Sequence, residues 1–192
     1  MAASTLQVPL AAIEALEALH ATVDAAVAEL VDRHRARLHC GPGCSTCCMD
    51  GLSVFLVEAG RIALGHPDLL AGGEPGPEGA CAFLDAAGAC RIYASRPYVC
   101  RTQGLPLRWL DLTGEAGGEW REHRDICPLN VPGGPPVEDL PPDDCWPLGP
   151  VEDRLAALQD AVDAAAGLSK AERREKGGRR VPLRRLFQRS GG

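Results

Sequence analysis

Four cysteines occur within the nine-residue segment CGPGCSTCC: Cys40, Cys44, Cys47 and Cys48. Thiolates are soft ligands that suit zinc, copper(I) and iron–sulfur clusters. Two residues separate Cys44 from Cys47, a spacing that lets both sulfurs reach one metal from a tight turn. The glycines and the proline between Cys40 and Cys44 allow the backbone to bend around that site. The segment therefore predicts a metal site or thiol chemistry.

The adjacent pair Cys47 and Cys48 poses a geometric problem for a single metal. Side chains of consecutive residues tend to diverge, so we do not expect both thiols to be terminal ligands of one tetrahedral ion. One of the two could serve a second site, or could bridge two metals. The pair hints at eight thiolates around two centres rather than four around one.

Five further cysteines follow at wider intervals. Cys81 and Cys90 lie in CAFLDAAGACRIY, which predicts a β-hairpin with Gly88 at the turn, so the two thiols are expected to face each other. Cys100 and Cys127 come later in the chain. Cys145 fits no pattern, and an isolated cysteine is most often a small buried apolar residue.

Disulfide bonds are the competing interpretation of nine cysteines. The N-terminal segment has no basic stretch, and Glu14, Glu17 and Asp24 interrupt its apolar residues, so it reads as neither a signal peptide nor a membrane span. We expect a cytoplasmic protein, in which clustered cysteines bind metal or react as thiols. The odd number of cysteines would also leave one thiol unpaired.

The elements around the cysteines predict a mostly α-helical protein with short β-hairpins, a small α+β fold around an irregular cysteine-rich metal-binding centre. Apolar residues recur at helical spacing over residues 10–38, which Gly41 and Pro42 end, and over 151–166, which Pro150 begins. Residues 52–64 predict a short helix. The segments LPLRWLDL and EWREHRDI predict a second hairpin. Aromatic residues are only 4% of the chain, so its core is thin.

Four regions follow from this pattern: an N-terminal helix over 1–39, the cysteine domain over 40–148, a helix over 149–168 and a basic tail over 169–192. Residues 170–192 hold nine Lys or Arg and two Glu. We interpret the tail as solvated or folded back on the acidic remainder, and as lying outside the metal site. It shows no nucleic-acid-binding motif, so no nucleic-acid partner is expected, whereas a protein partner remains open.

Two histidines and three arginines lie near the cysteines in the sequence. His39 and His123 could be nitrogen ligands, although a histidine in such a position is more often simply exposed. Arg91, Arg96 and Arg101 surround the later cysteines. We expect some of these arginines to offset thiolate charge and to donate hydrogen bonds to sulfur, which tunes a metal site.

Two motifs carry a resemblance to a known family. The first is C-x3-C-x2-C-C, and the second is C-x-F-L-D, then G-x-C-x-I-Y, then R-P-x-x-C-R. Over about residues 38–130 the chain resembles the YkgJ-type cysteine-cluster family, described as a zinc- or iron-chelating domain. Ala82 replaces a proline that is common in the family, and Cys127 resembles its eighth cysteine. The matching positions are Cys40, Cys44, Cys47, Cys48, Cys81, Phe83, Leu84, Asp85, Gly88, Cys90, Ile92, Tyr93, Arg96, Pro97, Cys100 and Arg101.

The resemblance implies metal binding by the eight cysteines from Cys40 to Cys127, and no common reaction. A related cluster in flagellin lysine methylases resembles an iron–sulfur site, which favours a [4Fe–4S] cluster over zinc. Three functions are compatible with this: a module that carries, stores or senses a metal or cluster, an enzyme whose cluster supports redox chemistry or modification of a partner, and a structural zinc protein. The first is preferred because no motif indicates a substrate pocket.

Overall fold

Contacts along the chain divide it into two units whose segments alternate in sequence. The computed structural model describes residues 8–41, 43–113, 118–175 and 178–187. The first unit comprises Met1–His20, Pro42–Pro97 and Arg154–Gly192, and the second comprises Ala21–Gly41 and Tyr98–Asp153. The long helices α1, Leu10–Arg33, and α5, Pro150–Ala165, each contribute residues to both units.

Helix α1 carries the apolar stripe that its sequence predicts, with Ile13, Leu16, Val23 and Leu30 buried. It ends at Arg33 and not near residue 38 as predicted. Contacts made in the second unit account for the early end. The Arg33 guanidinium donates to the Asp144 carboxylate at 2.9 Å, and a ring nitrogen of His34 lies 2.7 Å from the Asp144 carbonyl oxygen. Residues 34–37 therefore turn, and Pro42, which was predicted to stop the helix, lies outside the described residues.

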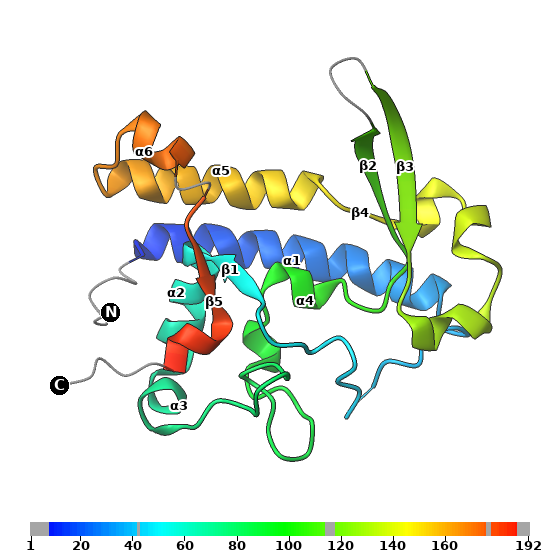
Figure 1. The fold of residues 1–192 in the computed structure, drawn as a ribbon, viewed down its shortest axis with the longest axis horizontal. Coiled ribbons are helices and arrows are strands. Elements are labelled where there is room, and N and C mark those ends of the chain that lie inside the picture. Colours follow the sequence, from blue (N-terminus) through cyan, green and yellow to red (C-terminus); the bar gives the residue numbers. More distant parts are fainter. Residues whose placement is uncertain (1–7, 42, 114–117, 176–177, 188–192) are drawn as a thin grey trace. The chain divides into compact units, whose positions relative to one another are not determined.

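The first unit combines short helices with a two-stranded sheet. Strand β1, Ser53–Phe55, pairs antiparallel with β5, Arg180–Pro182, so that segments distant in sequence lie side by side (Figure 1). Helix α2, Leu56–Gly65, follows β1 directly, so the single helix predicted over 52–64 is a strand and then a helix. The shorter helices of this unit are α3, Pro67–Gly72, η2, Tyr93–Ser95, α6, Lys170–Glu175, and η6, Leu183–Phe187.

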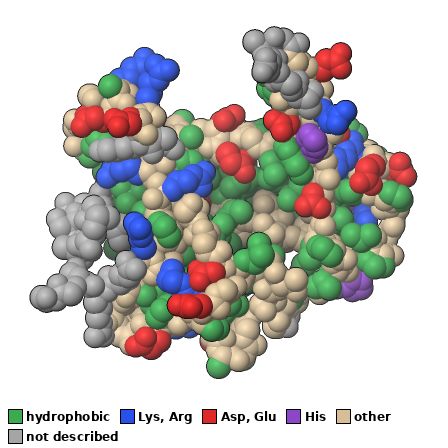
Figure 2. Space-filling model, in the orientation of Figure 1, with side chains coloured by type: hydrophobic (Ala, Val, Ile, Leu, Met, Phe, Trp, Pro, Cys, Tyr) green, Lys and Arg blue, Asp and Glu red, His purple; other side chains and the backbone are tan. Residues whose placement is uncertain are grey.

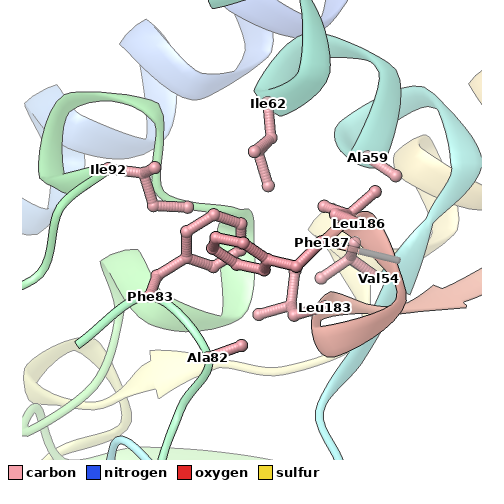
Figure 3. Packing of buried hydrophobic residues seen from close by; sticks show 9 residues of the cluster. All are labelled: Val54, Ala59, Ile62, Ala82, Phe83, Ile92, Leu183, Leu186 and Phe187. Carbon is pink, nitrogen blue, oxygen red and sulfur yellow. The ribbon is translucent and has the colours of Figure 1, made fainter. Parts of the chain in front are cut away.

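The apolar core of the first unit centres on Phe83, whose side chain is fully buried. Its ring meets that of Phe187 with 4.9 Å between ring centroids, as Figure 3 shows. Leu183 and Leu186 approach from the same C-terminal turn, η6. The sequence did not predict this packing, because these apolar residues lie within a stretch that is dominated by arginine. The remaining core members are Val54, Ala59, Ile62, Ala82 and Ile92.

Arg184 fastens the C-terminal turn to the segment before Cys81. Its guanidinium pairs with the Asp50 carboxylate at 2.8 Å and donates to the carbonyl oxygens of Gly76, Pro77 and Ala80 at 2.7–2.9 Å. Hydrogen bonding to Arg184 lowers the pKa of Asp50 below its usual value. Basic and acidic side chains likewise lie next to one another on the face that Figure 2 shows. Arg184 of the C-terminal turn thus has its partners within the first unit.

The second unit contains the predicted hairpin of β2, Leu107–Thr113, and β3, Glu119–Asp125. Of its predicted turn, residues 114–117 lie outside the described part of the chain. Strand β4, Trp146–Pro147, adds to β2 in parallel. The short helical elements of the second unit are α4, Tyr98–Arg101, and the 3-10 turns η3, Pro128–Gly133, η4, Val137–Asp139, and η5, Pro142–Asp144.

The predicted fold class is confirmed: the protein is a small α+β structure with several helices and sheets of two and three strands. In the part of the chain that the structure describes, no helix has both the length and the apolar character needed to cross a membrane.

The packing of η6 leads to a stability prediction. Phe187→Ala removes a buried ring and should lower the free energy of unfolding by about 3–5 kcal/mol. Urea unfolding followed by circular dichroism measures the change. Arg185→Ala, an exposed neighbour on the same turn, is the control and should change stability by less than about 0.5 kcal/mol. Equal stability of the two variants would show that the C-terminal segment is a solvated tail.

Candidate metal centre

Two cysteine-bearing segments of the first unit lie against each other. The backbone N–H of Cys81 donates to the carbonyl oxygen of Cys48 at 2.9 Å. A Cβ placed on Gly88 would lie 3.6 Å from the Gly43 carbonyl oxygen and 3.7 Å from the Ser45 hydroxyl. The turn at Gly88 therefore touches the loop that carries Cys44, Cys47 and Cys48.

The segment from Cys81 to Tyr93 is a tight turn and not a full hairpin. Gly88 adopts φ +76°, as predicted for the turn residue. The Asp85 carboxylate accepts the N–H groups of Ala87 and Ala89 at 2.9 and 2.8 Å, which fixes the turn locally. A single antiparallel bridge joins Leu84 to Cys90. The side chain of Asp85 accepts these N–H groups. The segments on either side of the turn therefore do not need a longer run of backbone hydrogen bonds between them.

The thiols of the first unit interact electrostatically. Burial, together with the charges of Cys47, Cys81 and Cys90, raises the pKa of the Cys48 thiol from 9.0 to about 12. The side chains of Cys47 and Cys48 are also hydrogen-bonded to each other. The two adjacent thiols therefore interact, and the backbone N–H of Cys48 closes a turn on the Ser45 carbonyl oxygen at 2.8 Å.

Two of the three arginines singled out in the sequence act on Cys90. Burial raises the pKa of the Cys90 thiol, whereas a backbone hydrogen bond from Ile92 and the charges of Arg96 and Arg91 lower it. The Arg91 guanidinium also donates to the carbonyl oxygens of Glu74 and Ala82, so it is held in place. The third, Arg101, lies in the second unit and forms an ion pair with Asp24 at 2.5 Å.

Three of the eight predicted ligands, Cys40, Cys100 and Cys127, lie in the second unit. Cys40 is exposed, and its Sγ accepts a hydrogen bond from the side-chain amide of Asn130 at 3.6 Å. Cys127 is half-buried, and its carbonyl oxygen accepts the backbone N–H of Asn130 at 2.8 Å. Cys100 is half-buried on α4. Asn130, which the sequence reasoning missed, thus links the surroundings of two predicted ligands.

Cys145 has the surroundings of a core residue. It is 2% exposed and packs with Ile126, Val137 and Leu140. Burial raises the pKa of its thiol. This placement agrees with the interpretation of Cys145 as a small buried apolar residue.

The two histidines considered as ligands have other contacts. The imidazole ring of His123 stacks on Trp109 with 5.5 Å between ring centroids. The backbone N–H of His39 donates to the side chain of Asn130 at 2.9 Å, and its side chain is exposed.

The residues present suit a thiolate-bound metal in their donor chemistry. All nine cysteines carry free thiols. Within the first unit, Cys48 lies in the electrostatic range of three other thiols. In the described segments no three Cys, His, Asp or Glu side chains are already gathered as a ligand set for a metal ion. A metal bound here would therefore draw neighbouring thiolates closer.

Comparison with protein families supports this assignment. Residues 39–128 match the CxxCxxCC family, whose description is "Putative zinc- or iron-chelating domain". The match contains eight of the nine cysteines and excludes Cys145. No curated protein and no solved structure matches the chain. Residues 39–128 of the chain are therefore similar to the zinc- or iron-chelating domains that this family model describes.

Proposed function

We propose that the protein binds metal through its clustered thiolates and that the bound group is an iron–sulfur cluster in preference to zinc. The candidate ligands are Cys40, Cys44, Cys47, Cys48, Cys81, Cys90, Cys100 and Cys127. The protein would then serve as a carrier or sensor of that group. A redox or protein-modifying enzyme that depends on the cluster is the second candidate.

The mutual electrostatic effect of the thiols around Cys48 is the observation that carries the proposal. Burial is the largest cause of the raised pKa of Cys48, and the charges of Cys47, Cys81 and Cys90 contribute to it because bringing thiolates together without a cation is unfavourable. A bound metal reverses this effect, because its positive charge favours the deprotonated sulfurs. Thiols that repel one another when ionised are therefore suited to share a metal or cluster.

The surroundings of Cys90 support an anionic metal complex. A metal with four thiolate ligands, whether zinc or a [4Fe–4S] cluster, carries net negative charge in its common states. Arg91 and Arg96 supply positive charge at Cys90. Arginine charge and hydrogen bonds near the sulfurs are among the features that set the reduction potential of a cluster.

The preference for iron–sulfur over zinc rests on the family resemblance. A structural zinc site and a [4Fe–4S] cluster each take four thiolate ligands. Eight cysteines lie within the matched segment, enough for two centres of either kind, so the number of thiols does not distinguish the two metals.

Substitution of individual cysteines tests the ligand set. Cys48→Ser and Cys90→Ser should each lower the metal content per chain, measured by plasma emission spectroscopy, to less than half of the parent value. Both should also lower the melting temperature, because metal binding contributes folding free energy in such proteins. Cys145→Ala is the control and should retain the parent metal content. Full loading of both serine variants would remove these cysteines from the ligand set.

The raised pKa of Cys48 predicts how the metal-free protein responds to pH. The unfolded chain releases the Cys48 proton near the usual value of 9.0, and the folded chain keeps it to about 12. Between these values the unfolded state binds fewer protons, so stability is present below pH 9 and is lost as the pH rises. Urea midpoints of the metal-free protein should fall from pH 8.5 to 11.

Cys48→Ser separates this contribution from other groups that titrate at high pH. The variant should show a shallower fall in urea midpoint over the same range. Parallel pH profiles for the parent and the variant would contradict the assignment of a raised pKa to Cys48.

A further inference from the structure

Asn130 lies two residues beyond the segment that matches the family, and its side chain is fully buried. Its Nδ2 donates to Cys40 Sγ at 3.6 Å and to the Gly104 carbonyl oxygen at 2.8 Å. Its Oδ1 accepts the backbone N–H of His39 at 2.9 Å. A flipped amide would lose these hydrogen bonds, so the network directs the NH₂ group at the sulfur.

Arg37 holds the backbone of Asn130 from the other side. Its Nε donates to the Asn130 carbonyl oxygen at 3.2 Å, and a second guanidinium nitrogen donates to the Pro135 carbonyl oxygen at 3.1 Å. Arg37 is 3% exposed, and no carboxylate within the described residues pairs with it. A buried guanidinium therefore adds positive charge to the surroundings of Asn130.

Gly104 leaves the space that the Cys40 thiol occupies. A Cβ at this position would lie 2.5 Å from Cys40 Sγ and 3.4 Å from the Asn130 amide nitrogen. Gly104 also adopts φ +92°, which favours glycine. The backbone of Gly104 and the side-chain amide of Asn130 thus both contact the Cys40 thiol. The position of this thiol depends on both residues.

We infer that Asn130 is a positioning residue for Cys40 as a metal ligand. Its N–H group donates to the sulfur and fixes the position of the thiol, and Arg37 keeps Asn130 in place. The inference rests on the proposed function, because it concerns how one of the proposed ligands is held. It assigns a role to two residues, Asn130 and Arg37, that lie outside the family motifs.

Asn130→Asp tests the inference with little change of shape. The aspartate retains an acceptor for the His39 N–H, loses the donor to Cys40 and places negative charge beside the sulfur. Cobalt(II) titration of the full-length, metal-free protein, with a competing chelator, gives the affinity. Removing such an indirect contact typically weakens metal binding by about 10- to 100-fold, and that loss is expected here. The thiolate-to-cobalt absorption band should also shift or weaken.

Gln159→Glu is the matched control. Gln159 is also a fully buried amide, and it accepts from the Val57 N–H and donates to Asp163. The same amide-to-carboxylate change there should lower the melting temperature without changing the cobalt spectrum. It separates a loss of stability from a loss of the hydrogen bond to sulfur.

A double-mutant cycle with Cys40→Ala decides whether Asn130 acts through Cys40. In the Cys40→Ala background, Asn130→Asp should weaken cobalt binding by less than about threefold, since the sulfur that it positions is gone. An equal loss in both backgrounds, or parent-like binding by Asn130→Asp, would overturn the inference and leave the proposed function intact. A parent protein that binds no cobalt, and that contains neither iron nor zinc when purified without oxygen, would overturn the proposed function itself; if the parent holds only iron, iron content per chain replaces cobalt affinity in the same comparison. If Asn130→Asp does not fold, Asn130→Ser takes its place, and its loss of cobalt affinity is again compared between the parent and the Cys40→Ala backgrounds.

Discussion

The packing of the Phe83 ring holds the cysteine-bearing turn of the first unit in place. Phe83 lies between Cys81 and Cys90 in sequence, and its carbonyl oxygen accepts the Arg91 N–H at 2.9 Å. The ring is buried against Phe187, so the C-terminal turn covers the base of the segment that carries these thiols. In a chain with three phenylalanines, this one contact positions two candidate ligands and closes the core.

Local sequence signals predicted the elements that depend on neighbouring residues. Pro150 marks the start of α5, the β2–β3 hairpin lies where its alternating segments predicted it, and Gly88 has the positive φ of its turn. The missed features depend on distant residues. Helix α1 ends early because Asp144, more than a hundred positions away, contacts Arg33 and His34.

The candidate site shows the same division between local and distant signals. Spacing alone identified the cysteines, and the charges of Arg91 and Arg96 act on Cys90 as the sequence suggested. Arg101 instead pairs with Asp24. Asn130 was missed because it is uncharged, lies outside the motif and is 90 positions from Cys40. The proximity that makes it relevant arises only when the second unit folds.

Metal binding by thiolates is the central proposed property of this chain, with an iron–sulfur cluster as the proposed bound group. Iron, zinc and acid-labile sulfide, measured per chain in protein purified without oxygen, test this most directly. The account predicts iron and sulfide in equal amounts, about four of each per [4Fe–4S] cluster, with little zinc. Zinc without sulfide would contradict the iron–sulfur assignment, and a chain free of both metals would contradict metal binding altogether.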